Sequence, residues 1–221
     1  MPKRTKLVIG AAVAAVILLP TAAGSFYQIQ EQEQAVLVTF GKPKAVTETG
    51  LHLKRPLSQQ VHKVNTTIQG FPFGYNEADN EVVESESIMI TSDYNFIDVD
   101  FFVEYRISDP VAYLYASREP EQILRSISQS CIRNVIGSYV VDDVLTTGKS
   151  AIQAKIKEMI GSEGELFAMG FTDFRVRWYA GAARLQFPTV QLPRVLERRE
   201  EILTKLKKYY PAVLLALEVR G

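Results

Sequence analysis

The stretch that decides the fold class spans residues 95–107 and reads NFIDVDFFVEYRI. Apolar and polar residues alternate along it. The apolar positions are Ile97, Val99, Phe101, Val103, Tyr105 and Ile107, and the polar ones include Asp98, Asp100, Glu104 and Arg106. A period of two residues is that of a β-strand with one buried face. The stretch therefore predicts one long, half-buried strand from Asn95 to Ile107.

Shorter strand patterns precede this stretch, beginning near residue 27. An apolar run within residues 34–40 is followed by Gly41 and Pro43, which predicts a buried strand and a turn. Residues 50–54 and 61–64 alternate polar and apolar side chains. The N-terminal half is thus predicted to form a β-sheet.

Helical patterns follow the long strand. Asp109 is suited to cap a short helix that has Pro110 in its first turn. Apolar residues spaced by three and four predict a second helix over 119–137 and a third over about 149–170. Residues 171–178 alternate again, as a closing strand would. A sheet followed by packed helices indicates an α+β domain, which we place at residues 27–178.

The N-terminal segment carries a membrane signal. Residues 7–24 hold no charge, and a basic cluster precedes them. A spanning helix needs roughly 20 mostly apolar residues, so we predict a transmembrane signal anchor over 7–26 behind a cytoplasmic segment, 1–6. The alternative is a cleavable leader, because small residues at Thr21-Ala22-Ala23 follow Pro20. Both interpretations place the main domain outside the cytoplasm.

Composition excludes several classes of function. Lysine plus arginine equals aspartate plus glutamate at 25 each, so no overall field recruits nucleic acid. Cys131 is the single cysteine and lies in a helix-periodic apolar stretch, where we expect it to pack as a small hydrophobe. His52 and His62 are the two histidines, too few for a zinc site, and both are predicted to be solvated strand residues.

Acidic side chains form two candidate sites. Asp98 and Asp100 lie two apart on one strand face, a spacing that would suit paired acid and base roles if burial separated their pKa values. Asp79, Glu81, Glu84 and Glu86 lie in a locally acidic segment without calcium-loop periodicity. We interpret both sets as solvated, and predict no catalytic residue, no cofactor and no metal site.

A set of motifs occurs along the chain in a characteristic order. It consists of Glu33-Gln34-Ala35-Val36, Phe40-Gly41-Lys42, Gly50-Leu51-His52, Ser92-Asp93-Tyr94-Asn95 and Tyr105-Arg106-Ile107-Ser108-Asp109-Pro110. Their order and spacing resemble the SPFH or band 7 domain of stomatins, prohibitins and flotillins, over roughly residues 28–176. The resemblance implies a mostly antiparallel sheet followed by packed helices. Within that family, the runs at 133–137 and 146–149 are most similar to the HflK branch, which regulates the bacterial membrane protease FtsH.

This resemblance implies a non-enzymatic scaffold. Such a protein is a single-pass protein of the bacterial cell membrane, with its N-terminus cytoplasmic and its band 7 domain outside. Many copies assemble with an HflC-type subunit around an FtsH-type protease and control which membrane proteins reach it. The resemblance also favours the uncleaved anchor, since a cleaved leader would leave the domain untethered.

Residues 179–221 depart from the family pattern. Family members carry an acidic-Pro-Pro motif and a long helix rich in alanine, glutamate and lysine after the last strand, and neither occurs here. One helix is predicted over 195–210, where Leu196, Leu203 and Tyr210 are seven apart and Glu201 and Lys205 form an i,i+4 pair.

Three other functions remain open from the sequence. The first is a stomatin-like organiser of membrane lipid without a dedicated protease partner. The second is an exported hydrolase that uses the acidic strand face at Asp98 and Asp100. The third is a secreted monomeric binding module, which requires cleavage of the leader.

Overall fold

The computed structural model describes residues 24–146, 148–179 and 181–216 of the 221-residue chain. The chain divides into two compact units: the first combines residues up to Gln69 with Glu104–Arg118, and the second combines Gly70–Val103 with the chain from Glu119 onward. Among the described residues, no helix is long and apolar enough to cross a membrane. Residues 1–6 and residues 7–23 of the predicted anchor lie outside this part. Phe26, which we predicted as the last anchor residue, instead begins a strand.

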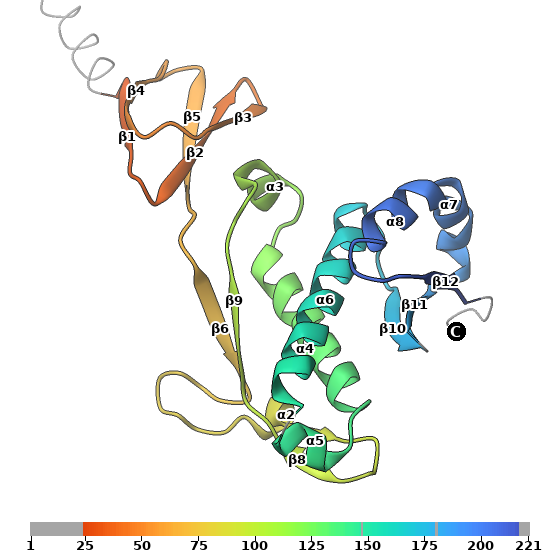
Figure 1. Cartoon of the computed structure of the whole chain (residues 1–221). Helices are drawn as coiled ribbons and strands as arrows, with labels where there is room; N and C mark the ends of the chain where they lie inside the picture. Colours follow the sequence, from red (N-terminus) through yellow and green to blue (C-terminus); the bar gives the residue numbers. More distant parts are fainter. Residues whose placement is uncertain (1–23, 147, 180, 217–221) are drawn as a thin grey trace, which may run out of the picture. The chain divides into compact units, whose positions relative to one another are not determined.

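The first unit is built mainly from short antiparallel strands (Figure 1). Its elements are β1 (Phe26–Ile29), β2 (Glu33–Thr39), β3 (Lys42–Val46), β4 (Gly50–Leu53), β5 (Gln59–Asn65) and α3 (Pro110–Tyr115). β1 pairs with β4, and β2 lies between β3 and β5. The Asp109 carboxylate accepts hydrogen bonds from the N–H groups of Val111 at 2.9 Å and Ala112 at 3.0 Å, which confirms the predicted cap of α3.

The predicted strand over 95–107 is divided into two. β8 (Phe96–Asp98) pairs with β7 (Ile88–Ile90), whereas β9 (Phe101–Tyr105) pairs with β6 (Gln69–Phe73). The strand breaks between them because the chain changes partner there, and the N–H of Val99 donates to the carbonyl of Ser87 at 3.1 Å. The predicted alternation is confirmed: Ile97 and Ile107 are buried, while Asp98, Asp100, Glu104 and Arg106 are exposed.

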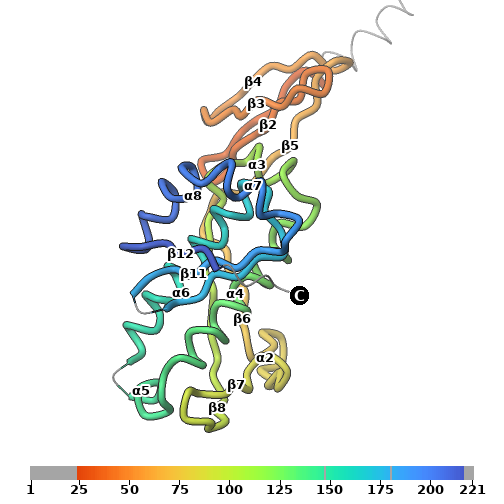
Figure 2. Tube along the Cα trace, turned by 90° about the vertical axis from the view of Figure 1, so that its right-hand side faces the viewer, coloured from red at the N-terminus to blue at the C-terminus, as the bar shows by residue number. Residues whose placement is uncertain are grey.

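Two long helices organise the second unit. α4 (Pro120–Ile136) and α6 (Lys149–Ala168) lie side by side, with the short α5 (Val141–Leu145) between them in sequence (Figures 1 and 2). Both match the predicted helices closely, because their apolar residues recur at helical spacing. Cys131 is fully buried in the shared core beside Ile132, as we expected of a small apolar side chain. The strands contribute Met89 and Ile97 to the same core.

The C-terminal part of the chain completes a second core around the end of α6. Its elements are β10 (Arg175–Tyr179), β11 (Ala182–Gln186), the 3₁₀ turn η1 (Thr189–Gln191), α7 (Leu192–Glu197), α8 (Arg199–Leu206) and β12 (Val213–Leu215). β11 lies between β10 and β12, antiparallel to the first and parallel to the second. Seven of the eleven buried residues in this core follow residue 178. The closing strand begins at Arg175, later than the Phe171 that we predicted, because Phe171 packs in this core straight after the α6 C-terminus.

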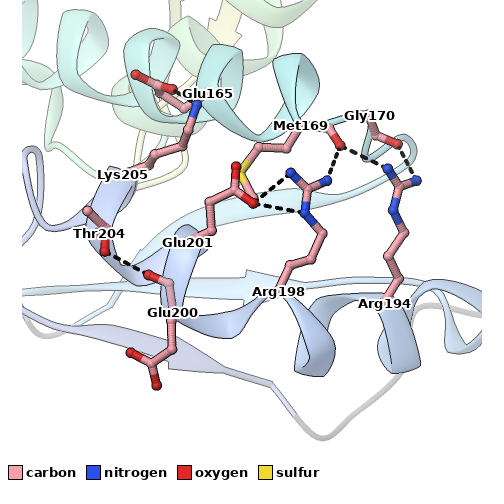
Figure 3. A network of polar contacts seen from close by, with 9 residues as sticks. All are labelled: Glu165, Met169, Gly170, Arg194, Arg198, Glu200, Glu201, Thr204 and Lys205. Carbon is pink, nitrogen blue, oxygen red and sulfur yellow. Dashed lines mark hydrogen bonds and ion pairs between the residues drawn. The ribbon is translucent and has the colours of Figure 1, made fainter.

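Two short helices stand where we predicted one over 195–210. The chain leaves helical geometry at Arg198, so Val195, Ile202, Leu206 and Tyr210 are buried and Leu196 is exposed. The predicted pair between Glu201 and Lys205 is also replaced. Glu201 instead bonds Arg198 at 2.7 Å, and Lys205 bonds Glu165 on α6 at 2.7 Å (Figure 3).

Two arginines hold the carboxyl end of α6, whose last carbonyls lack partners within the helix. Arg198 donates to the Met169 carbonyl at 2.7 Å, and Arg194 donates to the Met169 and Gly170 carbonyls, each at 3.0 Å (Figure 3). Gly170 allows the chain to turn there, with φ of +79°. Cations at the negative end of a helix also gain from its dipole.

We expect Arg198→Gln to lower the free energy of unfolding by about 1–2 kcal/mol, because it removes a charged hydrogen bond to a helix-end carbonyl. Chemical denaturation measures the change. Arg199→Gln is the matched control, since Arg199 is 71% exposed and pairs only with Glu200, which is 79% exposed, among the described residues. We expect a change below about 0.5 kcal/mol there. Equal losses in the two variants would contradict the assigned role of Arg198.

Candidate membrane-facing surface

One end of the first unit gathers exposed apolar side chains from three segments. The pairing of Phe26 with Leu53, and the bond from the Lys54 N–H to the Ser25 carbonyl at 2.7 Å, place the start of β1 beside the end of β4. The β2–β3 turn lies next to the loop that follows β4, because the Phe40 N–H donates to the Ser58 carbonyl at 3.3 Å. The chain from the predicted anchor therefore enters at this end.

The side chains at this end are far more exposed than core residues of their type. We call the set Phe26, Phe40, Leu51, Leu53 and Leu57 the apolar rim. Their exposed fractions run from 53% for Phe26 to 94% for Leu57. Full burial of one such side chain is worth about 1.5–3 kcal/mol, so their grouping at one end makes this surface a candidate for contact with another apolar phase.

The three sequence segments that carry the apolar rim contain cations and no acids, and Glu48 lies between the second and the third. Residues 24–30, 37–46 and 50–65 contain no aspartate or glutamate, and Lys42, Lys44, Lys54 and Arg55 lie within them. Each lysine or arginine near an anionic bilayer surface contributes about 1 kcal/mol of attraction. Apolar side chains framed by cations suit the boundary between lipid head groups and acyl chains.

The backbone of the turn between β2 and β3 has an unusual conformation at Phe40. Phe40 has φ of +48° and Gly41 has φ of +81°, so both lie in the left-handed region. Such a conformation is uncommon for a bulky aromatic residue and disfavoured by sterics. It leaves the Phe40 ring 84% exposed at the tip of the turn.

The predicted orientation of β4 was wrong. His52 is half-buried, whereas its neighbours Leu51 and Leu53 are exposed. The reason is the pairing with β1, which places Tyr27 opposite His52, and their rings stack with centroids 5.4 Å apart. His52 also bonds the Glu48 carbonyl at 2.8 Å. His62 is exposed, as predicted.

The structure does not bring the acidic candidates together as a site. Asp98 ends β8 and Asp100 follows it, and both side chains are exposed. In the described residues, no cluster of three or more histidine, cysteine, aspartate or glutamate side chains could hold a metal ion. These carboxylates therefore have the surroundings of a solvated strand face.

Glu86 corrects our interpretation of the acidic segment as wholly solvated. It lies in the short helix α2 (Glu84–Ser87). Its two carboxylate oxygens accept hydrogen bonds from the Arg125 guanidinium, at 2.9 and 3.0 Å. Arg125 also lies over the rings of Phe71 and Phe73, at 5.5 and 4.8 Å from their centroids. This ion pair fastens α2 to α4.

Comparison with known proteins identifies the fold. The family model of the SPFH domain / Band 7 family matches residues 27–178. A similar curated protein is "Modulator of FtsH protease HflK" of Escherichia coli K12, 34% identical over 167 residues, which are 76% of this chain and 37% of that protein. "Protein HflK" of Treponema pallidum is 33% identical over 142 residues, which are 60% of this chain and 43% of that protein.

A third relative is "Protein HflK" of Buchnera aphidicola subsp. Schizaphis graminum, 33% identical over 147 residues, which are 66% of this chain and 33% of that protein. The matches therefore span between about a third and two fifths of the curated relatives' length. Such membership makes the chain a non-enzymatic protein, and sets aside the hydrolase interpretation of Asp98 and Asp100. This chain belongs to the SPFH/band 7 family and is HflK-like.

Proposed function

We propose that this chain is a membrane-anchored scaffold subunit that assembles, with an HflC-type partner, around an FtsH-type membrane protease and modulates it. The observation that carries the proposal is its similarity to proteins named HflK, one of them named a modulator of FtsH protease. The apolar rim supports attachment of the domain to a lipid surface, in addition to the predicted anchor. Repeated copies in one assembly would multiply weak individual contacts through effective concentration.

A second candidate is a membrane organiser of the stomatin type that has no dedicated protease partner. The apolar rim favours it equally, because contact with lipid requires no protease. Affinity purification of the tagged chain from membranes of its own cells separates the two. Recovery of an FtsH-type ATPase above an untagged control supports the first function, and its absence together with retained self-assembly supports the second.

We further propose a single-pass topology, with residues 1–6 in the cytoplasm and the band 7 domain outside it. The competing possibility of a cleaved leader and a secreted monomer predicts a new N-terminus after about Ala23. N-terminal analysis of the membrane-bound protein decides between them. We expect Met1 or Pro2 at the N-terminus, and a start near Gly24 would exclude the anchor.

The apolar rim gives a direct test of membrane contact. We expect an environment-sensitive fluorophore on Leu57→Cys to shift to the blue in lipid nanodiscs and to be quenched by lipid-borne quenchers, because Leu57 is at the exposed tip of the rim. The native Cys131 should not react with the fluorophore, because it is fully buried and burial raises the pKa of its thiol.

Gln32→Cys is the matched control for the fluorophore. Gln32 is exposed and polar and precedes β2, whereas Phe40 follows β2 at its other end. We expect its label to remain in an aqueous environment. Equal spectra for the two labels would contradict membrane contact at the rim, while leaving the anchor and the protease proposal to their own tests.

A further inference from the structure

A pocket of about 290 Å³ opens in the second unit where the carboxyl end of α4, α6 and β10 meet. Three cationic residues line it, one from each element: Arg133, Lys155 and Arg177. Asn134, Ser138 and Trp178 add an amide, a hydroxyl and an indole. No acidic residue contributes to its lining. Its volume lies just below the range for small-molecule sites, roughly 300–1,000 Å³.

Lys155 carries a positive charge in partly apolar surroundings. Its ammonium lies 4.8 Å from the ring centroid of Trp178 and 5.1 Å from that of Tyr139. Burial holds the pKa of Lys155 below its usual range, an effect that the exposed Glu158 on the same helix opposes. Glu158 does not line the pocket. An anion in the pocket would therefore stabilise this ammonium.

The other two cations are also available to an anion. Arg133 donates one hydrogen bond to the Ser85 carbonyl, and a guanidinium has five N–H donors. Arg177 is exposed on β10 and has no ion-pair partner among the described residues. The carboxyl end of α4 contributes about half a negative charge, which is small against three cations.

The absence of a carboxylate from this pocket contrasts with the surroundings of three other cations of the second unit. The cations of Arg125, Arg198 and Lys205 are all close to carboxylates, at 2.9, 2.7 and 2.7 Å from Glu86, Glu201 and Glu165. A partly buried cation normally has such a partner, because desolvation of an unpaired charge is costly. The pocket lining therefore carries three cations and no carboxylate, and Lys155 is the partly buried one among them.

We propose that this pocket binds a phosphate-type oxyanion, either a soluble phosphate ester or the head group of an anionic phospholipid. Two guanidinium groups suit the paired oxygens of phosphate, and an ammonium supplies a third charge. A phosphate group carries one charge as a diester and up to two as a monoester, and in both forms its oxygens can accept from more than one of these donors at once. The space left beside the phosphate takes the group to which it is esterified.

Trp178 provides a specific reporter, because it is the single tryptophan of the chain and lines the pocket. Inorganic phosphate and glycerol 3-phosphate are titrated into the full 221-residue chain in a non-ionic detergent at constant ionic strength. Binding is followed by tryptophan fluorescence and by calorimetry. We expect saturable binding in both signals, and chloride should produce neither.

Loss of one cation should weaken binding about tenfold or more, because each contributes charged hydrogen bonds. Lys155→Gln and Arg177→Gln test this, and the exposed Arg177 makes the second variant safe for folding. Lys157→Gln is the matched control, since Lys157 is exposed on the same helix outside the pocket. Three results would overturn the proposal. Arg177→Gln could bind phosphate as tightly as wild type, or Lys157→Gln could lose as much affinity as the pocket variants. Calorimetry could also show heat of binding without a change in Trp178 fluorescence.

The source of the phosphate is decided by repeating the titration in nanodiscs. If the pocket takes a soluble ester, phosphate binds equally in phosphatidylcholine and phosphatidylglycerol nanodiscs. If it takes a lipid head group, phosphatidylglycerol occupies the pocket and suppresses binding of free phosphate, and Arg177→Gln removes that difference. Absence of saturable phosphate binding in phosphatidylcholine nanodiscs would overturn the proposal for both sources.

Discussion

Phe187→Ala is expected to lower the free energy of unfolding by about 3–5 kcal/mol, the largest change that we predict for a single substitution. Phe187 is 1% exposed, and the centroid of its ring lies 5.3 Å from that of Phe171 and 5.9 Å from that of Phe174. Its replacement leaves a cavity and removes both aromatic contacts. The loss matters because residues after 178 supply most of the second core.

Chemical denaturation of the full chain measures this effect, with Val190→Ala as the control. Val190 is 90% exposed and lies three residues further along, so its truncation should change stability by less than about 0.5 kcal/mol. Similar small effects in both variants would show that the C-terminal segment does not share a core with α6. Tyr210 supports the shared core, because its hydroxyl lies 3.0 Å from that of Ser162 on α6.

Glu163→Gln is expected to remove a pH dependence of stability. Glu163 is buried on α6, and desolvation raises its pKa to about 7, although hydrogen bonds from the Val176 backbone and the Cys131 thiol act in the opposite direction. The folded state therefore retains a proton that the unfolded state loses near pH 4.5. Stability falls as pH rises from about 4.5 to 7, because the folded state binds more protons in that window.

The predicted size of this effect is on the order of 3 kcal/mol between pH 5 and pH 8. Relative to wild type, Glu163→Gln should gain stability by that amount over this range, since its amide does not titrate. Glu158→Gln is the control, because Glu158 is exposed on the same helix. A constant difference between wild type and Glu163→Gln across the range would contradict the buried, protonated carboxyl.

Elements whose pattern is local could be predicted from the sequence. The stripe that includes Ile132 and Ile136 predicted α4, and the alternation around Ile97 predicted which side of the strand is buried. Both patterns depend on the period of one element, so no knowledge of its neighbours is required. The cap of α3 by Asp109 could be predicted for the same reason, because it depends on neighbouring residues alone.

Features set by distant partners could not be predicted. The exposed position of Leu53 depends on how β4 pairs with β1, and the role of Glu86 depends on Arg125, 39 residues away. The apolar rim was missed because its members belong to three segments that look ordinary separately. A scan for apolar stretches without acids, followed by strand pairing, would have indicated it.

The C-terminal residues show how tertiary packing overrides a local pattern. Spacing of seven favoured Leu196 as a buried position, but the bend at Arg198 turns Val195 inward instead. Arg198 donates a hydrogen bond to the Met169 carbonyl at the end of α6, a partner that the spacing of apolar residues does not indicate. Arg133, Lys155 and Arg177 likewise meet in one pocket only through packing of three elements.

We propose that this HflK-like chain works as a subunit of a membrane scaffold around a protease. The most direct test of this proposal is the mass and composition of the particle that contains the tagged chain after gentle detergent extraction from its own membranes. We predict a particle many times the mass of one chain that includes an HflC-type subunit and an FtsH-type protease. A monomer or small oligomer without either protein, under conditions that preserve other membrane complexes, would contradict it.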